Sequence, residues 1–490
     1  MAETQPLLGP RAEPQDPLAC LDDPKPVFDF DPNGDSDNPR EWPASFKRNI
    51  VALLACMAFT VTFTCISVVP VAHQIVSELD NGRPNDSASA LLVTIWELGE
   101  AAGPLLIAPL SEVYGRYPVM NVCNVLFIAA TVLAAVSQSS TLFIAARALT
   151  GLAVASNVLS PAIIGDIFEP DQRGSAMSLM MLAPLIGGAV GPAISGAVAQ
   201  TLGWRQVLWM SAGLAVACEI LFLTCFRETY KMVILRKRAP ELYRQHQLDL
   251  EPKEASDHGS LLKLWHSVTR PMSVLFSSGV LLALSLFGSI SFSYFYVMSI
   301  TLPDILQDIY GFSPALTGSA FITFSIGSFV AIAVCNVGLD RIYIHLRAHD
   351  PEGGKPEHRL PLTIVGAFAL PLAVMAYGWA AELRLPVPLL LLAAALLDGS
   401  LLLAMVPVSA YVVDAFGLYS ASAMTGVIVT RCLMGTFLPL STGPLRARFG
   451  YGWGFTILGA VRLLCLAPIP IFIMRYGATW RKASLYSRET

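Results

Sequence analysis

The chain has 490 residues, of which 54% are hydrophobic and 14% are charged. Soluble proteins carry about 25% charged residues, so much of this surface must face something other than water, and a polytopic membrane protein is expected. The net charge of -4 gives no electrostatic case for nucleic acid as a partner. The nine cysteines lack the spacing of a disulfide framework or a zinc site, so no metal is expected.

Residues 1–48 are acidic and rich in proline, and we expect a disordered cytosolic tail there. The first apolar run starts only near Ile50, so no signal peptide is expected. From there on, apolar runs of about 20 residues recur, which is the length that a helix needs to cross the hydrocarbon core. Because lipid-exposed backbone must be helical, twelve membrane-crossing helices are predicted, at 50–71, 88–110, 118–137, 141–165, 175–199, 205–226, 274–300, 314–338, 360–380, 387–411, 420–441 and 452–474.

A long polar and basic stretch separates six of these runs from the other six. Its Arg236-Lys237-Arg238 cluster marks the cytoplasmic side by the positive-inside rule, which places both chain ends inside. The expected organisation is therefore an N-terminal six-helix bundle at 49–226, a cytoplasmic central loop at 227–270, a C-terminal six-helix bundle at 271–475 and a cytosolic tail at 476–490.

Two features of the expected outer loops stand out. Asn85-Asp86-Ser87 is an N-glycosylation sequon in the first outer loop, so Asn85 is a candidate glycosylation site. Arg446 and Arg448 fall in the last outer loop and contradict the positive-inside rule there.

A weak internal repeat supports two related halves. The segment Ser111–Tyr114 (SEVY) follows the second span, and Leu339–Tyr343 (LDRIY) follows the eighth. Both place an acid and an aromatic residue at the cytoplasmic mouth of equivalent helices. Parallel repeats joined by a long central loop are typical of transporters whose halves rock about a site near the bilayer midplane.

The loop after the second span is the first candidate site, a gating loop. Gly99 and Gly103 form a GxxxG step, which lets a neighbouring backbone approach closely. Gly115 permits a tight turn, and Glu112 can pair with Arg116 or with nearby helix-end amides. An ordinary charged loop is the alternative interpretation, and the repeat favours gating.

Five charged residues lie inside the predicted spans and form a candidate proton and substrate cavity. They are Arg147, Asp398, Glu97, Glu100 and Arg431. A central arginine costs about 2.5–3.5 kcal/mol on insertion scales, so such groups usually face a bundle interior. Glu97 and Glu100 are three residues apart and share one helix face. A purely structural buried ion pair is the alternative.

The fifth span is rich in glycine. Gly187 and Gly191 fall on one helical stripe, and Gly188, Pro192 and Gly196 on the next. Stripes without side chains allow helices to pack closely or to slide, and Pro192 can kink the helix. Spacing alone does not decide between static packing and a moving interface.

Taken in order, these segments resemble the major facilitator superfamily, and specifically its fungal drug:proton antiporter branch. The resemblance covers nearly the whole chain from Asp35. It is carried by DSDNPREWP in the tail, GPLLIAPLSEVYGRYP at Gly103–Pro118, LFIAARALTG at Leu142–Gly151, PLIGGAVGPAISG at Pro184–Gly196, GWR at Gly203–Arg205, RETY at Arg227–Tyr230 and YVVDAF at Tyr411–Phe416.

The resemblance implies an all-α membrane protein with twelve transmembrane helices in two six-helix repeats, the major facilitator fold. It implies that the gating loop acts as a latch between states, that Arg147 takes part in proton coupling, and that the glycine stripes lie where the halves open and close. Helices two and eleven meet in this fold, so Glu100 is expected to pair with Arg431 in one transport state. Asp398, on the repeat partner of helix four, is expected to face the same cavity as Arg147. Glu219 and Arg462 fall on helices that the family turns toward lipid.

The function predicted from the resemblance is proton-coupled efflux of an amphiphilic small molecule, such as a drug, toxin or fungal secondary metabolite, by alternating access. The proton gradient would supply the energy, and no bound cofactor is expected. The chain has no nucleophile–base pair, so an enzyme is not expected. We expect a monomer in the plasma membrane, with the vacuolar membrane as the alternative. Proton-coupled uptake of a polyamine, vitamin or organic acid, and a non-transporting membrane sensor, are the other functions considered.

Overall fold

The computed structural model describes residues 30, 35, 37–83, 85–245, 268–349 and 355–482. Most of the expected tail at 1–48, part of the central loop and the end of the chain lie outside these ranges. Helices joined by short turns make up the described residues, and no β-strand occurs among them.

The N-terminal half is a bundle of long helices with short helical segments between some of them. Its elements are η1 (Pro39–Glu41), α1 (Ala44–Ile66), η2 (Val69–Val71), α2 (Ala72–Leu79), α3 (Asp86–Tyr114), α4 (Arg116–Ala135), α5 (Ser140–Leu152), α6 (Ser156–Ile167), α7 (Pro170–Leu202) and α8 (Trp204–Cys225), followed by α9 (Lys231–Gln245) in the central loop. The helix α1 begins before the expected boundary at residue 49.

The C-terminal half repeats this plan. Its elements are α11 (Gly279–Asp304), η3 (Ile305–Ile309), α12 (Pro314–Ala320), α13 (Ile322–His349), η4 (Pro356–Arg359), α14 (Pro361–Glu382), α15 (Val387–Phe416), η5 (Gly417–Tyr419), α16 (Ser420–Phe437), η6 (Leu438–Ser441), α17 (Thr442–Cys465) and α18 (Ile469–Lys482). The last helix continues past residue 476, where a tail was expected.

Eleven helical stretches in the described ranges are long and apolar enough to cross a membrane. The last of them contains a turn and is long enough for two crossings. Ser420–Arg481 has 62 residues. At about 1.5 Å per residue it would measure roughly 90 Å if straight, about three times the hydrocarbon core. The chain reverses within α17 at Gly450, whose φ of 71° is open to glycine but strained for other residues. The predicted total of twelve crossings is thus confirmed.

Glu382 holds the reversal at Gly450 in place. Its carboxylate accepts hydrogen bonds from the backbone N–H of Tyr451 at 2.8 Å and of Gly452 at 3.2 Å. A Cβ at Gly450 would lie 2.8 Å from that carboxylate. The acid therefore caps the first free amides of the returning helix, where a negative charge is favourable.

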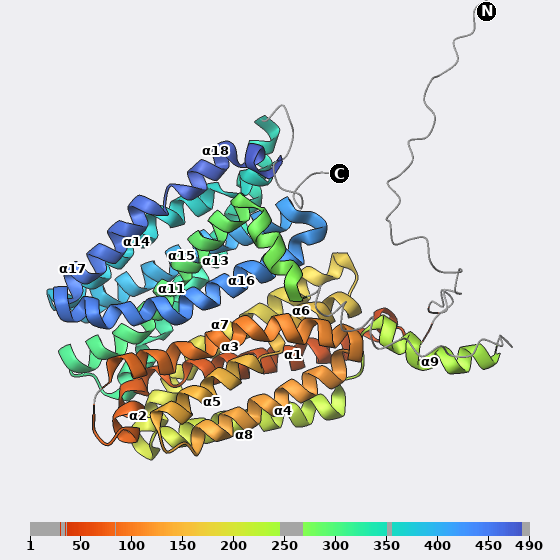
Figure 1. The fold of residues 1–490 in the computed structure, drawn as a ribbon, viewed down its shortest axis with the longest axis horizontal. Helices are drawn as coiled ribbons and strands as arrows, with labels where there is room; N and C mark the ends of the chain where they lie inside the picture. Colours follow the sequence, from red (N-terminus) through yellow and green to blue (C-terminus); the bar gives the residue numbers. More distant parts are fainter. Residues whose placement is uncertain are drawn as a thin grey trace, which may run out of the picture.

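The two halves lie side by side, with the N-terminal half drawn in orange and yellow and the C-terminal half in green and blue (Figure 1). Their helices run roughly parallel from the end that carries α9 to the end that carries α2 and the start of α17. Because α9 contains the Arg236-Lys237-Arg238 cluster, we call the opposite end the outer end.

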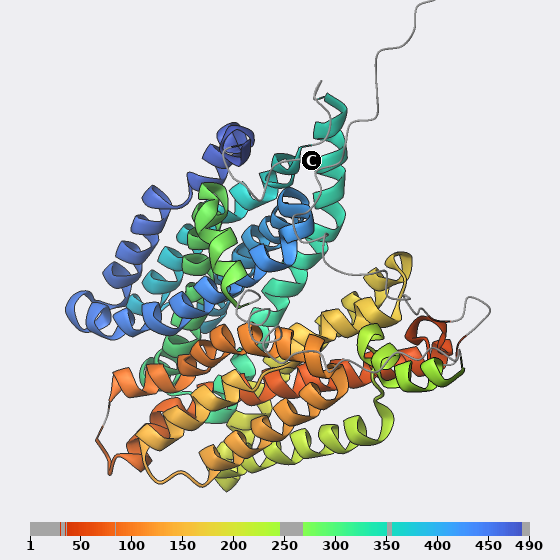
Figure 2. The same cartoon turned by 45° about the vertical axis from the view of Figure 1, so that its right-hand side comes forward.

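The halves approach one another closely at the outer end and diverge toward the cytoplasmic end (Figure 2). There α12 packs on α7 with almost no side chain between the backbones. A Cβ at Gly196 would contact the carbonyl oxygen of Pro314, and a Cβ at Gly318 would contact that of Pro192. The structure is therefore closed at the outer end.

The two charged residues on helices that the resemblance turns toward lipid, Glu219 and Arg462, have buried side chains. Glu219 is 4% exposed and accepts a hydrogen bond from Asn124 at 2.7 Å. Arg462 is fully buried and donates to the Ala367 carbonyl and the Ser291 hydroxyl, each at 2.7 Å. Both side chains satisfy polar groups inside their own half, which is how a buried charge becomes tolerable.

Candidate functional site

The candidate site lies where α3 of the N-terminal half meets α11 and α16 of the C-terminal half. Glu97 and Glu100 of α3 are 1% and 4% exposed. The Tyr296 hydroxyl of α11 donates to Glu97 Oε1 at 2.6 Å, and the Asn157 amide donates to Glu100 Oε1 at 2.8 Å. The hydrogen bond of Glu97 therefore crosses to the opposite half, whereas that of Glu100 lies within its own half.

Arg431 of α16 joins Glu100 across the two halves. Its Nη2 atom lies 3.7 Å from Glu100 Oε1, and its guanidinium lies 4.4 Å from the centroid of the Phe292 ring. The structure thus brings together the pair that the sequence predicts for one transport state. Their separation in the other state stays a prediction.

The two carboxylates are not fully satisfied. Among the described residues, no hydrogen bond reaches Glu97 Oε2 or Glu100 Oε2. The Cys432 sulfur lies with them in a group whose potential ligand atoms are within 4.8 Å of one another. These three residues could hold a metal ion by distance, but the positive Arg431 beside Glu100 disfavours one.

Arg147 of α5 is buried and donates to backbone carbonyls. It reaches Cys65 at 2.6 Å and Thr64 at 3.3 Å, near the end of α1, and Leu92 of α3 at 3.4 Å. A cation at a helix C-terminus is favourable because the last carbonyls have no partner in the helix. Arg147 thus ties three helices of one half together.

Asp398 of α15 lies in the other half and is 4% exposed. The Ser328 hydroxyl of α13 donates to its carboxylate. The expectation that Asp398 and Arg147 face one cavity stays a prediction, because the hydrogen bonds described for each of them lie within its own half. Both lie inside the protein, as expected, and not against lipid.

The gating loop is built differently from the predicted Glu112–Arg116 pair. Arg116 donates to Asp166 at 3.3 Å and to the Ser111 hydroxyl, and its guanidinium lies 4.5 Å from the centroid of the Tyr230 ring. Glu112 points to the exposed side of α3. Asp166, at the end of α6, is the acid that the sequence reading missed.

Glu228 was also missed, and it closes the turn between α3 and α4. Its carboxylate accepts hydrogen bonds from the backbone N–H of Arg116 at 2.8 Å and of Tyr117 at 3.2 Å. Gly115 sits between the helices with φ 104°, and a Cβ there would contact this carboxylate. The RETY segment therefore caps α4, as Glu382 caps the helix after Gly450. The expected close approach at Gly99 and Gly103, nearer the middle of α3, agrees with the structure, because both glycines face the backbone of α5.

The C-terminal half contains the counterpart of the Arg116 cluster. Arg359 donates to Asp340 at 2.7 Å and to Asp414 at 3.0 Å, and its guanidinium lies 4.4 Å from the centroid of the Tyr343 ring. Burial lowers the pKa of Arg359, but hydrogen bonds to the two carboxylates outweigh it and raise the pKa overall. Asp340 and Tyr343 belong to the sequence repeat, and each half thus carries an arginine between the ends of two helices.

The glycine stripes of α7 have two different partners. Gly187 and Gly191 face Phe59 and Phe63 of α1 within the same half. Pro192 and Gly196 face α12 of the other half, as described above, whereas Gly188 has only ordinary contacts. One stripe therefore packs within the N-terminal half, and the other belongs to the interface between the halves.

Asn85 precedes α3 and is exposed. Its side-chain oxygen accepts a hydrogen bond from the Ala88 N–H at 3.0 Å, which makes it the N-cap of the helix. Its glycosylation stays a prediction.

Comparison with known proteins bears on the whole chain. The family model of the Major Facilitator Superfamily matches residues 49–439. The efflux pump radE of Floropilus chiversii is 32% identical over 477 residues, which cover 97% of this chain and 87% of that protein. The MFS-type transporter penM of Penicillium rubens is 32% identical over 454 residues, covering 92% and 88%.

Solved structures show the same fold. A D-xylose–proton symporter superimposes with a TM-score of 0.66 at 17% identity, covering 87% of this chain and 97% of that one. The human organic anion transporter MFSD10 superimposes with a TM-score of 0.59 at 19% identity, covering 88% and 100%. Fold, motifs and relatives agree, and the chain belongs to the major facilitator superfamily.

Proposed function

We propose that this chain is a secondary active exporter that moves an amphiphilic small molecule out of the cytosol in exchange for protons. Family membership makes the chain a multi-pass membrane transporter of small molecules and not an enzyme. The relative named as an efflux pump supports export as the direction. The fungal secondary metabolites expected from the sequence are the proposed substrate class.

The observation that carries proton coupling is the group of Glu97, Glu100, Tyr296 and Arg431 between the two halves. A buried carboxylate is costly unless it is paired or protonated. In the described state, closed at the outer end, Arg431 stabilises the charged form of Glu100 at 3.7 Å. When the outer end opens and α16 moves away from α3, Glu100 loses this partner and takes up a proton.

These two states give a cycle. The outward-open exporter releases its substrate and accepts a proton from the acidic side. Return of Arg431 to Glu100 then expels the proton toward the cytosol. Proton and substrate each favour one orientation of the halves, and the coupling arises from this difference in affinity.

Flux into inside-out vesicles tests this proposal. We expect a panel of fluorescent amphiphiles and fungal metabolites to accumulate only while the vesicle interior is acidic, and to stop when an uncoupler removes the pH gradient. Accumulation that ignores the gradient would exclude proton coupling. Gradient-driven loss from preloaded vesicles would favour the uptake function, and binding without flux would favour a sensor.

For oligomeric state, membrane location and energy source, we propose what the sequence analysis predicts. The exporter works as a monomer in the plasma membrane, or in the vacuolar membrane, with the proton gradient in place of a cofactor. Surface labelling of intact cells and the molecular mass in detergent test location and oligomeric state.

A further inference from the structure

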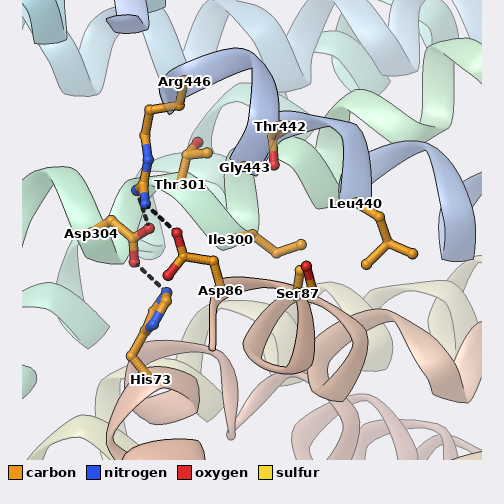
Figure 3. Close-up of a pocket in the computed structure, with 11 residues that line it drawn as sticks. His73, Asp86, Ser87, Ile300, Thr301, Asp304, Leu440, Thr442, Gly443 and Arg446 are labelled. Carbon is orange, nitrogen blue, oxygen red and sulfur yellow. Dashed lines mark hydrogen bonds and ion pairs between the residues drawn. The ribbon is translucent and has the colours of Figure 1, made fainter. Parts of the chain in front are cut away.

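Four charged side chains, two from each half, point toward one another at the outer end (Figure 3). This outer cluster consists of His73 of α2, Asp86 of α3, Asp304 of α11 and Arg446 of α17. None of the four belongs to the site at mid-depth. Arg446 is also one of the two residues that contradict the positive-inside rule.

Asp304 is the centre of the outer cluster. Its Oδ1 lies 2.9 Å from His73 Nε2, and its Oδ2 lies 2.7 Å from Arg446 Nη1. The second guanidinium nitrogen of Arg446 lies 2.9 Å from Asp86 Oδ2. Asp304 is only 8% exposed, whereas the side chains of His73 and Asp86 are 38% and 52% exposed. The cluster therefore joins a buried acid to groups that the outer solution reaches.

Two of these three contacts cross between the halves. His73 belongs to the N-terminal half and Asp304 to the other, and the same holds for Asp86 and Arg446. The outer ends cannot separate unless both contacts break. Separation would leave Asp304 with Arg446 alone, and an acid of this burial is destabilised by the loss of a partner.

We propose that the outer cluster is an ion-pair gate that holds the outer end closed, and that His73 makes this gate sensitive to the pH of the outer solution. Histidine is the side chain whose charge changes between about pH 5 and pH 8. The charged imidazolium attracts Asp304, with which it is in contact, and also the nearby Asp86. Both attractions weaken when His73 loses its proton, and with them the contact between His73 and Asp304.

The other neighbours of α2 do not reverse this sign. Arg446 of α17 repels the imidazolium, but it is itself paired with Asp304 and Asp86. The segment η2 has no titratable side chain, and the one titratable residue of α5, Arg147, donates to the carbonyls near the end of α1. Acid on the outer side therefore favours the closed gate.

This inference rests on the proposed function for its role in the cycle. An exporter driven by protons must close its outer end after it has released substrate and taken up a proton. A gate that acid closes favours this return step, and it does so where the proton gradient is largest.

The distance between the halves can be measured directly. Arg83 and Arg448 are exposed at the outer end, one in each half. Spin labels attached to p-acetylphenylalanine at these two positions leave the native cysteines in place. We would record the distance distribution of the full chain in lipid nanodiscs at pH 5 and pH 8, without substrate.

Glu100 takes up a proton in the open state, so its pH effect opposes that of His73, and the measurement is made in a Glu100→Gln background. There we expect the open population to rise between pH 5 and pH 8, and His73→Gln to remove this dependence. Asp304→Asn should raise the ratio of open to closed molecules by about fivefold or more at pH 5, as a coupling of ordinary size does. Glu78→Gln is the matched control, because the 2.6 Å pair of Glu78 with Arg205 is also exposed but lies within one half. The distance distribution of Glu78→Gln should match that of the parent protein at both pH values.

Unchanged distances in Asp304→Asn would overturn the gate. A pH response that survives His73→Gln would overturn the role of the histidine and assign the response to the carboxylates at mid-depth. The labels report distance without any transport, so these outcomes are independent of the vesicle assay. Normal distances with no gradient-driven flux would contradict the proposed function alone.

Discussion

Arg147 shows how much a single buried cation does in this fold. Its guanidinium serves three carbonyl groups of α1 and α3 at once, which a single ammonium group cannot reach. We expect Arg147→Lys to lower the free energy of unfolding by about 1–3 kcal/mol, because buried carbonyls lose their donors.

Thermal unfolding in detergent measures this loss. Arg205→Lys is the control, since Arg205 is exposed and should tolerate the change. Equal melting temperatures for parent and Arg147→Lys would contradict the structural role.

Asp398 is a buried acid that has no role in the proposed proton site, and we predict that it binds substrate. Ser328 is its described partner, and an ionised carboxylate there would attract a cationic substrate. We expect Asp398→Asn to reduce transport of a cationic amphiphile by about tenfold, which matches a charge-assisted hydrogen bond, and to affect a neutral analogue little. Equal losses for both compounds would remove Asp398 from the substrate site.

At the scale of elements, the capped turns between helices decide where the chain reverses. Gly115 combines φ 104° with the nearby Glu228 carboxylate. We expect Gly115→Ala to cost about 1–3 kcal/mol of stability, because both the backbone and the space oppose a side chain. Gly213→Ala, at an exposed helical position with nothing near its Cβ, should be neutral or slightly stabilising.

The melting temperatures of the two alanine variants give a direct comparison. A loss of the same size in both variants would show that the Gly115 turn has no special requirement. A loss confined to Gly115→Ala supports the cap by Glu228.

The elements also show what the sequence could reveal. The spans were predictable because the bilayer demands apolar helices of fixed length. The Glu100–Arg431 pair was predictable only from the resemblance, which implies that helices two and eleven meet. The contacts of Asp166 and Glu228 with the Arg116 turn could not be predicted from the sequence, because contacts between the ends of different helices depend on tertiary packing. The burial of Glu219 and Arg462 depends on how each helix is rotated, and hydropathy carries no such signal. The turn at Gly450 could not be predicted either, because the presence of a glycine does not reveal which backbone φ it adopts.

At the scale of the whole molecule, closure of the outer end requires the backbones of α7 and α12 to touch. A methyl group at Gly196 would meet the Pro314 carbonyl of the other half, whereas one at Gly188 has room. We expect Gly196→Ala to shift the population toward the open outer end by about fivefold or more, and Gly188→Ala to leave it unchanged. The spin-label distances between the halves measure this shift, and an identical population in both variants would contradict it.

The central claim is that one carboxylate group between the halves exchanges protons for substrate, and substrate-driven proton movement tests it most directly. In proteoliposomes with a trapped pH dye, no initial pH gradient and the membrane potential clamped, a substrate gradient should move protons in the opposite direction. Glu100→Gln should still bind substrate but move no protons. Proton movement that persists in Glu100→Gln, or its absence in the parent protein while substrate crosses the membrane, would contradict the account.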